Sequence, residues 1–305
     1  MSALIEFVPN ISEGRRLDVI AEIAAALRAV PGALLLSQSS DSDHNRTVFT
    51  LVGSAEALTE AARTLFVQVS RHVDLRAHLG EHPRMGAVDV APFIPVRGAG
   101  MDECVALARR VAAMVAGEFG VPIYLYANAA THETRRVLAD IRRGGYEGLA
   151  EKMRRPGWAP DFGPDQPHPA LGASAVGARN YLIAYNLLLD TPDVEIARAV
   201  ARAVRASSGG LPHVQAIGLF LESRGLAQVS LNLLNFEETP LHVVQERVKS
   251  EAAARGAKVV AAELIGHAPQ AALTAAAAHY LQIEGWSGGM VLEEAIERGM
   301  AGRWL

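Results

Sequence analysis

The chain has 305 residues, half of them hydrophobic, and a formal net charge of −4 at pH 7. This length is typical of about two domains, and the apolar content is enough for a sizeable core. The slightly acidic balance argues against nucleic acid as a partner, because phosphate binding needs a basic surface. A single cysteine, Cys104, excludes an internal disulfide, and its place in a helical pattern indicates a small core residue.

The chain shows no sign of membrane insertion or export. No apolar run approaches the about 20 residues that cross a bilayer. The first residues lack the basic and apolar regions of a signal peptide. We therefore expect a soluble, cytoplasmic protein with no membrane partner.

The first half of the chain predicts the order strand, helix, strand, strand, helix, strand. Apolar periodicity and β-branched residues place these elements at 3–8, 15–29, 33–37, 46–52, 55–72 and 87–96. Ser54 suits the cap of the second helix, and residues 39–45 are predicted to form a polar turn. Further segments follow: a helix at 101–119, a strand at 121–126, and helical patterns at 132–143 and 145–153.

The second half repeats this order with almost no residue identity. Strands are predicted at 181–189, 214–221, 227–234 and 259–265, with helices at 191–206 and 240–255 and terminal helices at 269–283 and 291–300. We predict an α/β (α+β) protein of two tandem ferredoxin-like β-α-β-β-α-β subdomains with helices packed on the sheets. The subdomains are placed at 1–178 and 179–305.

Residues 154–172 interrupt the pattern with many prolines and glycines. Trp158 and Phe162 argue against a disordered linker, which would be poor in aromatic residues. A long ordered loop of this kind is either a binding loop or a strap between domains, and the composition leaves both readings open.

The stretch 79–89 reads Leu-Gly-Glu-His-Pro-Arg-Met-Gly-Ala-Val-Asp and places His82 in a turn. Pro83 disfavours helical geometry at the histidine, and glycines on either side allow a tight path. Three charged residues lie within the same stretch. A loop histidine beside charges is a candidate for proton transfer, although most such histidines are simply solvated. Other polar clusters lie in loops at 10–14, 41–46 and 161–165.

Several other kinds of site are excluded by spacing. His78 and His82 are four residues apart, but Gly80 and Pro83 interrupt the helix that would bring them onto one metal ion, so we expect no metal. No phosphate-binding loop is present, and Gly209-Gly210 follows a helix rather than a strand. No Gly-x-Ser-x-Gly elbow suggests a nucleophile. Acid–base chemistry on a bound small molecule remains.

A family resemblance rests on several stretches in the same order. They are Phe7-Val-Pro-Asn-Ile-Ser-Glu-Gly14, Asn45-Arg-Thr-Val48, Gly80-Glu-His-Pro-Arg-Met-Gly-Ala-Val-Asp89, Pro122-Ile-Tyr-Leu-Tyr126, Trp158-Ala-Pro-Asp-Phe-Gly-Pro164, Gly177-Ala-Arg179 and Ala227-Gln-Val-Ser230 with Asn232. With these the chain resembles the glutamate formimidoyltransferase family, which is also the transferase half of formimidoyltransferase-cyclodeaminase. The resemblance covers nearly all of residues 3 to 280.

The resemblance implies an activity and its site. The family moves the formimidoyl group of N-formimidoyl-L-glutamate to N5 of tetrahydrofolate, giving 5-formimidoyltetrahydrofolate and L-glutamate, a step of histidine degradation and one-carbon metabolism. It implies His82 as general acid/base, tetrahydrofolate as co-substrate, no metal and a homodimer. We expect no cyclodeaminase domain here, so a separate cyclodeaminase would act downstream. The implied folate loop consists of Gly163, Pro164, Asp165, Gln166, Pro167, His168, Pro169, Ala170, Leu171 and Gly172.

The implied chemistry suggests further substrate contacts. One histidine can take the proton that N5 loses and give a proton to the departing glutamate amine. The amidine arrives as a cation, so a carboxylate should face it, and the substrates' own carboxylates need cationic anchors. The candidate carboxylates are Glu13, Asp41, Asp43 and Glu81. The remaining candidates are Asn10 and the arginines Arg46, Arg84 and Arg179.

One segment departs from the family pattern. Members often carry an aspartate after Leu-Leu in the second strand region, whereas here the segment is Leu35-Leu36-Ser37-Gln38-Ser39. The difference puts one polar substrate contact in doubt. Two alternatives therefore stay open: a folate-dependent transferase that uses N-formyl-L-glutamate, and a folate-binding protein without catalysis.

Overall fold

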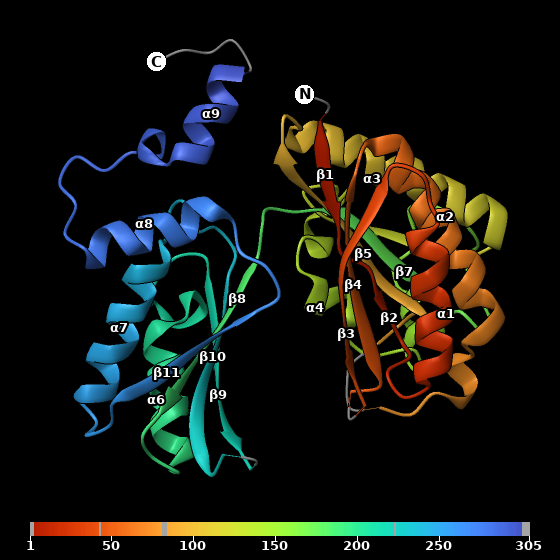
Figure 1. The fold of residues 1–305 in the computed structure, drawn as a ribbon. Coiled ribbons are helices and arrows are strands. Elements are labelled where there is room, and N and C mark those ends of the chain that lie inside the picture. The colour runs from red at the N-terminus through yellow and green to blue at the C-terminus, as the bar shows by residue number, and fades with distance from the viewer. Residues whose placement is uncertain (1–2, 43, 81–83, 223, 301–305) are drawn as a thin grey trace. The chain divides into compact units, whose positions relative to one another are not determined.

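A computed structural model describes residues 3–42, 44–80, 84–222 and 224–300. The chain divides into two compact units, Met1–Arg179 and Asn180–Leu305 (Figure 1). Each unit has its own sheet and its own hydrophobic core. The predicted fold class is confirmed, since both units combine a mixed or antiparallel sheet with packed helices. Among the described helices, none is both long enough and apolar enough to cross a membrane.

The N-terminal unit begins with the predicted β-α-β-β-α-β order. Its elements are β1 (Leu4–Phe7), β2 (Asn10–Ile11), α1 (Leu17–Arg28), β3 (Ala33–Asp41), β4 (Arg46–Gly53), α2 (Ala55–His72), β5 (Val88–Arg97), α3 (Met101–Phe119), β6 (Ile123–Ala127), α4 (Leu138–Arg142), α5 (Leu149–Met153) and β7 (Ser174–Ala178). Single 3-10 turns lie at Leu75–Ala77 and Glu133–Arg135.

The first predicted strand is split into β1 and β2 at Pro9. Proline has no N–H to give to a ladder, but its carbonyl still accepts from Phe49 N at 3.0 Å. Both halves lie between β4 and β5 and pair with each in antiparallel fashion. β3 pairs with the outer side of β4.

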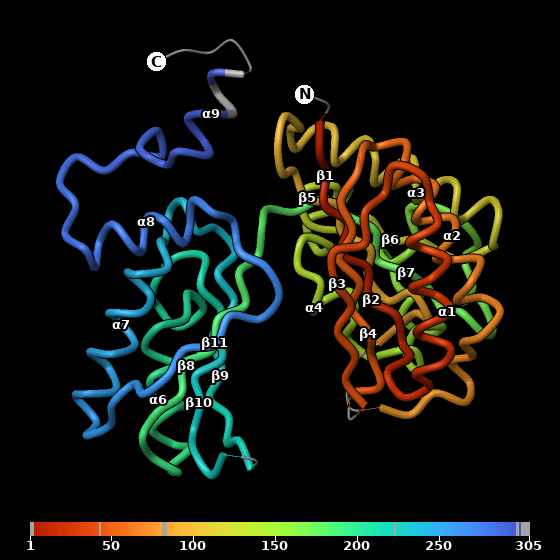
Figure 2. The backbone as a smooth tube through the Cα atoms, in the orientation of Figure 1, coloured from red at the N-terminus to blue at the C-terminus, as the bar shows by residue number. Residues whose placement is uncertain are grey.

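Two parallel strands extend this sheet beyond the predicted pattern. β7 pairs with β5, and β6 pairs with β7. Figure 2 shows β6 and β7 side by side, although α4, α5 and residues 154–172 separate them along the chain. β7 was not predicted, because Ser-Ala-Val-Gly-Ala is short and largely small. Every one of its residues is buried, so tertiary packing rather than local propensity decides this strand.

Other predicted elements differ in length. The strand expected at 33–37 continues to Asp41, which pairs with Arg46, so the predicted turn at 39–45 is shorter. A register shift between Leu35 and Ser37 lets its polar residues join the ladder. The two helical patterns at 132–143 and 145–153 reduce to α4 and α5. Gly144 and Gly145 have positive φ values of 95° and 62° and break them.

The two faces of the N-terminal sheet differ in what covers them. Helices α1, α2 and α3 lie on one face and α4 lies on the other (Figure 1). Ile5 and Phe7 belong to the core under α1–α3, where Phe7 stacks on Phe93 with centroids 4.7 Å apart. We call the opposite side the open face. Its smaller core, around Tyr124 and Tyr126, packs with Ile141 of α4 and with residues of α5.

The C-terminal unit has the predicted order in its simplest form. Its elements are β8 (Ile183–Leu189), α6 (Val194–Val204), β9 (Val214–Leu221), β10 (Leu226–Leu233), α7 (Leu241–Ala253), β11 (Val259–Ile265), α8 (Gln270–Tyr280) and α9 (Leu292–Met300), with 3-10 turns at Ala206–Ser208 and Gly288–Met290. The antiparallel sheet has the order β11-β8-β10-β9. Val200 of α6 and Val244 of α7 are fully buried in its core.

Candidate active site

Loops that are far apart in sequence meet at one end of the N-terminal sheet. Ser12 Oγ donates to the carbonyl of Gly86 at 2.8 Å, and Gly14 N donates to Asn45 Oδ1 at 2.8 Å. Gly86 also forms an antiparallel bridge with Gly172. The polar loops around 10–14, 41–46 and 84–89 and the end of the predicted folate loop are therefore neighbours.

Asn45 joins three of these segments. Its side-chain nitrogen donates to Leu79 O at 3.0 Å, and its carbonyl accepts from His78 Nε2 at 3.0 Å. Asn45 has a φ of 48°, which asparagine tolerates better than most residues. Burial lowers the pKa of His78, so His78 is held neutral, with its proton on Nε2, as a structural link to Asn45.

Residues 81–83 lie outside the described residues, and with them Glu81 and His82. Both flanks of this segment are anchored. The Arg84 guanidinium donates to His78 O at 3.0 Å and to Glu147 Oε1 at 2.9 Å. Met85 N donates to Asp89 Oδ1 at 2.8 Å. The chain therefore enters and leaves the segment at fixed points.

The end of the predicted folate loop packs directly against the stretch after His82. Gly172, with a φ of 68°, comes so close to the Met85 carbonyl that a Cβ atom would overlap it. Ala87 N donates to Leu171 O at 3.0 Å. The loop is closed on itself by His168, whose Nδ1 accepts from Leu171 N at 3.0 Å. The two stretches that carry the family motifs thus form one structural element.

The preceding part of the 154–172 segment is anchored within the N-terminal unit. Arg135 forms a buried ion pair with Asp161 at 2.7 Å and donates to the carbonyls of Gly157 and Ala159 at 2.8 and 2.6 Å. Its guanidinium also lies 5.3 Å from the centroid of the Tyr124 ring. One arginine thus holds this part of the segment against β6.

Ionisable side chains line the open face near the start of β4 and β5. Arg142 of α4 reaches Asp89 at 2.5 Å, and the Asp89 side chain is only 2% exposed. Arg46 is electrostatically coupled to both Arg142 and Asp89, and burial lowers its pKa below the usual value. Asp41, which pairs with Arg46 across β3 and β4, also acts on Arg46, so two arginines and two aspartates meet at this end of the face.

A second group of ionisable residues lies further along the open face. Tyr126 is hydrogen-bonded to Arg179, and burial raises the pKa of this tyrosine. Its ring lies over Gly177, where any Cβ atom would overlap it. Glu6 of β1 is 6% exposed, and burial raises its pKa to about 7, against the opposing effect of Arg179.

Comparison with known proteins identifies the family of this fold and site. The formiminotransferase domain, N-terminal subdomain, matches residues 4–179, and the formiminotransferase domain matches residues 184–298. The chain belongs to the formiminotransferase family. The resemblance seen in the sequence is confirmed.

Individual members of the formiminotransferase family are similar over most of the chain. Glutamate formimidoyltransferase of Streptococcus pyogenes is 45% identical over 93% of this chain and 95% of its own length. The enzyme of the same name from Thermoplasma acidophilum is 41% identical over 97% of this chain and 98% of its own. Formimidoyltransferase-cyclodeaminase of the rat is 46% identical over 93% of this chain, which spans only 53% of that protein.

Two of the predicted carboxylates have partners within the protein. Glu13 Oε1 accepts from the N–H groups of Arg15 and Arg16, both at 2.9 Å, so it closes the turn that precedes α1. Burial alone would raise the pKa of Glu13, but these N–H groups and the Arg16 guanidinium lower it below the usual value. Asp41 accepts from His44 N at 2.9 Å and contacts His44 Nδ1 at 2.8 Å. Asp43 lies outside the described residues.

The predicted arginines fall into two groups. Arg84 is 9% exposed and is used by His78 and Glu147 within the fold. Arg46 and Arg179 belong to the open face. Asn10 pairs with Val48 and Val90 between β4 and β5, and its side chain donates to Val8 O at 3.2 Å.

Four ionisable residues of the open face were not among the predicted site residues, although Asp89 was noted as a charge near His82: Glu6, Asp89, Tyr126 and Arg142. A signal existed for the first two, because Leu-Ile-Glu-Phe and Val-Asp-Val-Ala each place a carboxylate inside an otherwise apolar strand. Charged residues are rarely buried without a specific reason. Arg142 gave no such signal, since it lies in an ordinary helical pattern.

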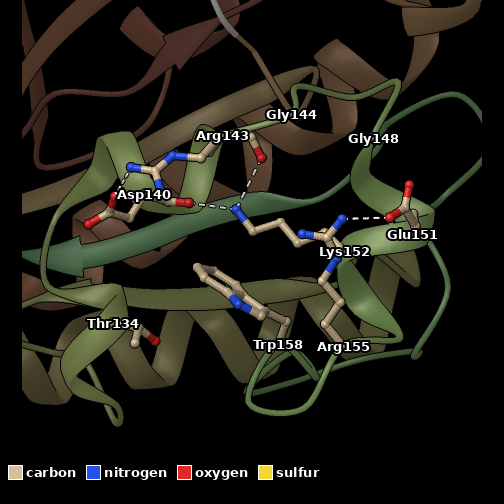
Figure 3. Close-up of a pocket in the computed structure, with 9 residues that line it drawn as sticks. All are labelled: Thr134, Asp140, Arg143, Gly144, Gly148, Glu151, Lys152, Arg155 and Trp158. Atoms are coloured by element: carbon tan, nitrogen blue, oxygen red, sulfur yellow. Dashed lines mark hydrogen bonds and ion pairs between the residues drawn. The ribbon is translucent and has the colours of Figure 1, made fainter.

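A cavity of about 510 Å³ lies beside α4 and α5 (Figure 3), and was also not predicted. It is lined by Thr134, Asp140, Arg143, Gly144, Gly148, Glu151, Lys152, Arg155 and Trp158. Lys152 Nζ donates to the carbonyls of Asp140, Ile141 and Arg143 at 2.5, 2.7 and 3.2 Å. It also lies 3.9 Å from the centroid of the Trp158 ring. Lys152 therefore caps the end of α4, with its three donors used.

The C-terminal unit presents a neutral polar row. Gln228, Ser230 and Asn232 of β10 alternate with the core residues Val229 and Leu231. They belong to the motif Ala227-Gln-Val-Ser230 with Asn232 that carried part of the family resemblance. Among the residues that the structure describes, no group of three or more His, Cys, Asp or Glu is gathered in a way that could hold a metal ion.

Proposed function

We propose that this protein transfers the formimidoyl group of N-formimidoyl-L-glutamate to N5 of tetrahydrofolate, with His82 as general acid/base. The proposal is carried by the packing of two family motifs against each other. The loop that ends at Gly172 packs on Met85–Ala87, a stretch that begins three residues after His82. The identity of 45% to a glutamate formimidoyltransferase over nearly its whole length supports the reaction.

The proposed reaction needs one base that becomes an acid. N5 of the folate forms a bond to the amidine carbon and gives its proton to the His82 imidazole. The bond between that carbon and the glutamate nitrogen then breaks, and the imidazolium returns the proton to the leaving amine. A histidine with a pKa near 6.5 suits both steps. Holding the two substrates together supplies much of the remaining rate.

Asp89 suits a positioning role in this reaction. Its Oδ1 holds Met85 N and its Oδ2 holds Arg142. Loss of this carboxylate would release the backbone three residues after His82 and leave the half-buried Arg142 without its partner. We expect Asp89→Asn to lower kcat more than it weakens folate binding, because geometry at the reacting atoms is lost first.

The arginines of the open face suit the charge of the substrates. Both the donor and the folate tail carry carboxylates, which arginine binds with paired hydrogen bonds. Arg46 and Arg179, predicted as anchors, and Arg142 all belong to this face. We assign these three to substrate carboxylates because they line one face together, whereas Arg84 binds His78 and Glu147 at the flank of the His82 segment.

The test is an assay of purified protein with tetrahydrofolate and either N-formimidoyl-L-glutamate or N-formyl-L-glutamate, with the product followed by absorbance. We expect turnover with the formimidoyl donor. Turnover with the formyl donor alone would support the first alternative. Folate binding without turnover of either donor would support a non-catalytic binding protein.

The cellular setting completes the proposal. We infer that the protein is a cytoplasmic homodimer in which each chain has two ferredoxin-like subdomains, 1–178 and 179–305. It acts in histidine degradation, with tetrahydrofolate as co-substrate and without a metal. A separate cyclodeaminase acts on its product. The similarity to glutamate formimidoyltransferases over nearly their whole length supports the transferase reaction in this setting. Light scattering tests the dimer, and unchanged activity after chelation tests the absence of a metal.

A further inference from the structure

Glu6 lies in the middle of β1 with its side chain on the open face. Its neighbours Ile5 and Phe7 belong to the core under α1–α3, and strand geometry points alternate side chains to opposite faces. In the register, Glu6 is paired with Val52 of β4 and Ile94 of β5. Its immediate strand neighbours are therefore apolar.

The Glu6 side chain is largely buried and has no hydrogen-bond or ion-pair partner in the described part of the chain. The residue is 6% exposed, and within the described ranges no hydrogen bond or ion pair includes its carboxylate, whose oxygens keep some contact with solvent. Arg179 influences it only through longer-range charge. Buried carboxylates are nearly always hydrogen-bonded, because desolvation without compensation is costly. An apolar residue would serve a purely structural role better at this position.

The missing partner can be described by its chemistry. A carboxylate offers two acceptor oxygens in one plane, and its natural complement is a planar group with two N–H donors on one side. Both substrates of the proposed function contain such a group. The donor has its amidinium, and the pterin ring has the edge formed by its 2-amino group and the adjacent ring N–H.

We propose that Glu6 is a substrate-binding carboxylate that accepts two hydrogen bonds from the N–C–N edge of a substrate. The proposal rests on the proposed function. It places one end of the substrate over β1, on the face that also carries Tyr126 and Arg179. Asp41 and Glu13, by contrast, have internal partners.

Binding of each substrate to Glu6→Gln, measured by calorimetry, tests this role. The amide has one acceptor and one donor, so it mismatches an edge with two donors, and one substrate should bind at least about ten-fold more weakly. A loss confined to formimidoylglutamate identifies the amidinium as the ligand, and a loss confined to tetrahydrofolate identifies the pterin. Glu6→Asp, which keeps the charge, should restore part of the lost affinity.

The exposed carboxylate of Glu56, 79% accessible on α2, provides the matched control. Glu56→Gln should leave both affinities unchanged. Unchanged affinities in Glu6→Gln would overturn the proposal, and so would a parallel loss of both affinities and of thermal stability, which would indicate a structural role. Because calorimetry needs no turnover, a failure of the transferase activity is distinguishable from a failure of Glu6. If Glu6→Gln does not fold, Glu6→Asp binding with wild-type affinity would overturn the proposal, and weakened binding with unchanged thermal stability would support it.

Discussion

The two units share one element order and differ in what their sheets present. The N-terminal sheet carries Glu6, Asp89 and Tyr126 in buried positions on its open face. The central strand β10 of the C-terminal sheet carries the neutral Gln228, Ser230 and Asn232 instead. One architecture thus supports buried ionisable residues on one sheet and a row of neutral polar residues on β10 of the other, where Glu263 of β11 is an exposed charge on the same face.

Part of the difference arises from the extension of the N-terminal unit. Arg142 comes from α4, Tyr126 from β6, and Arg179 from the end of β7. None of these elements has a counterpart in the described C-terminal unit, where β8–β11 form the whole sheet. The comparison teaches that strands of the shared order carry Glu6, Arg46 and Asp89, whereas the added elements bring Arg142, Tyr126 and Arg179 beside them.

The largest effect expected in the N-terminal unit follows from His82→Ala. Loss of a general acid/base lowers kcat by about 10²–10⁴-fold, while folate affinity and the melting temperature stay unchanged. Steady-state kinetics and calorimetry measure these quantities. Full activity in this variant would exclude His82 as the acid/base and would remove the main functional contrast between the units.

Arg135→Ala should cost stability in the same unit. It leaves Asp161 buried without its cation, and breaking a buried pair typically costs about 3–5 kcal/mol in the free energy of unfolding. Urea unfolding measures the loss. Arg155→Ala is the control, because its pair with Glu151 is largely exposed and such pairs contribute about 0–1 kcal/mol. Equal losses in the two variants would contradict the role of Arg135.

Glu6→Gln should make stability less dependent on pH. Burial raises the pKa of Glu6 from its ordinary value of 4.5 to about 7. The carboxylate therefore costs no folding free energy below pH 4.5. The cost grows as the pH rises from 4.5 to about 7, and above that pH it is complete. The variant should therefore gain up to about 3 kcal/mol at pH 8 and little at pH 4. Urea unfolding at both pH values decides, and a gain that is larger at pH 4 would refute the burial argument.

Lys152→Met should destabilise the segment around α4. The Lys152 ammonium donates to three backbone carbonyls. In the variant these carbonyls lose their donor, which should lower the free energy of unfolding by about 1–3 kcal/mol. Burial lowers the pKa of Lys152 to about 8, below its unfolded value, so burial penalises the charged form at neutral pH. That penalty should fade as the pH rises through alkaline values. Thermal unfolding at pH 7 and pH 9 measures both effects, and a variant as stable as the wild type at pH 7 would argue against the capping role.

The smallest effect is expected in the C-terminal unit. Ser230→Ala removes a neutral hydroxyl from the side of β10 that faces away from the C-terminal core. It should change the free energy of unfolding by less than about 1 kcal/mol and leave the pH dependence of that free energy unchanged. A large pH-dependent effect would mean that ionisable groups on this face also control stability, and the contrast between the units would fail.

Much of the fold of both units could be predicted from the sequence. The helices at 55–72 and 101–119 and the strands at 214–221 and 259–265 appear with the predicted bounds, because their apolar periodicity is uninterrupted and Ser54 caps the first of them, accepting from Ala57 N. The loops that carry the family motifs were also predicted. The strand β7 was not, since small residues alone give no strand signal.

The sequence by itself determined the two-unit α+β class, the family, and the stretch that contains His82, because periodicity and motif residues are local properties of the chain. Only the tertiary structure decided that the loop ending at Gly172 packs on Met85, that Arg142 meets Asp89, and that Glu6 lies buried without a partner. These facts depend on which strands become neighbours and on which side chains lose contact with water. Neither can be read from spacing along the chain.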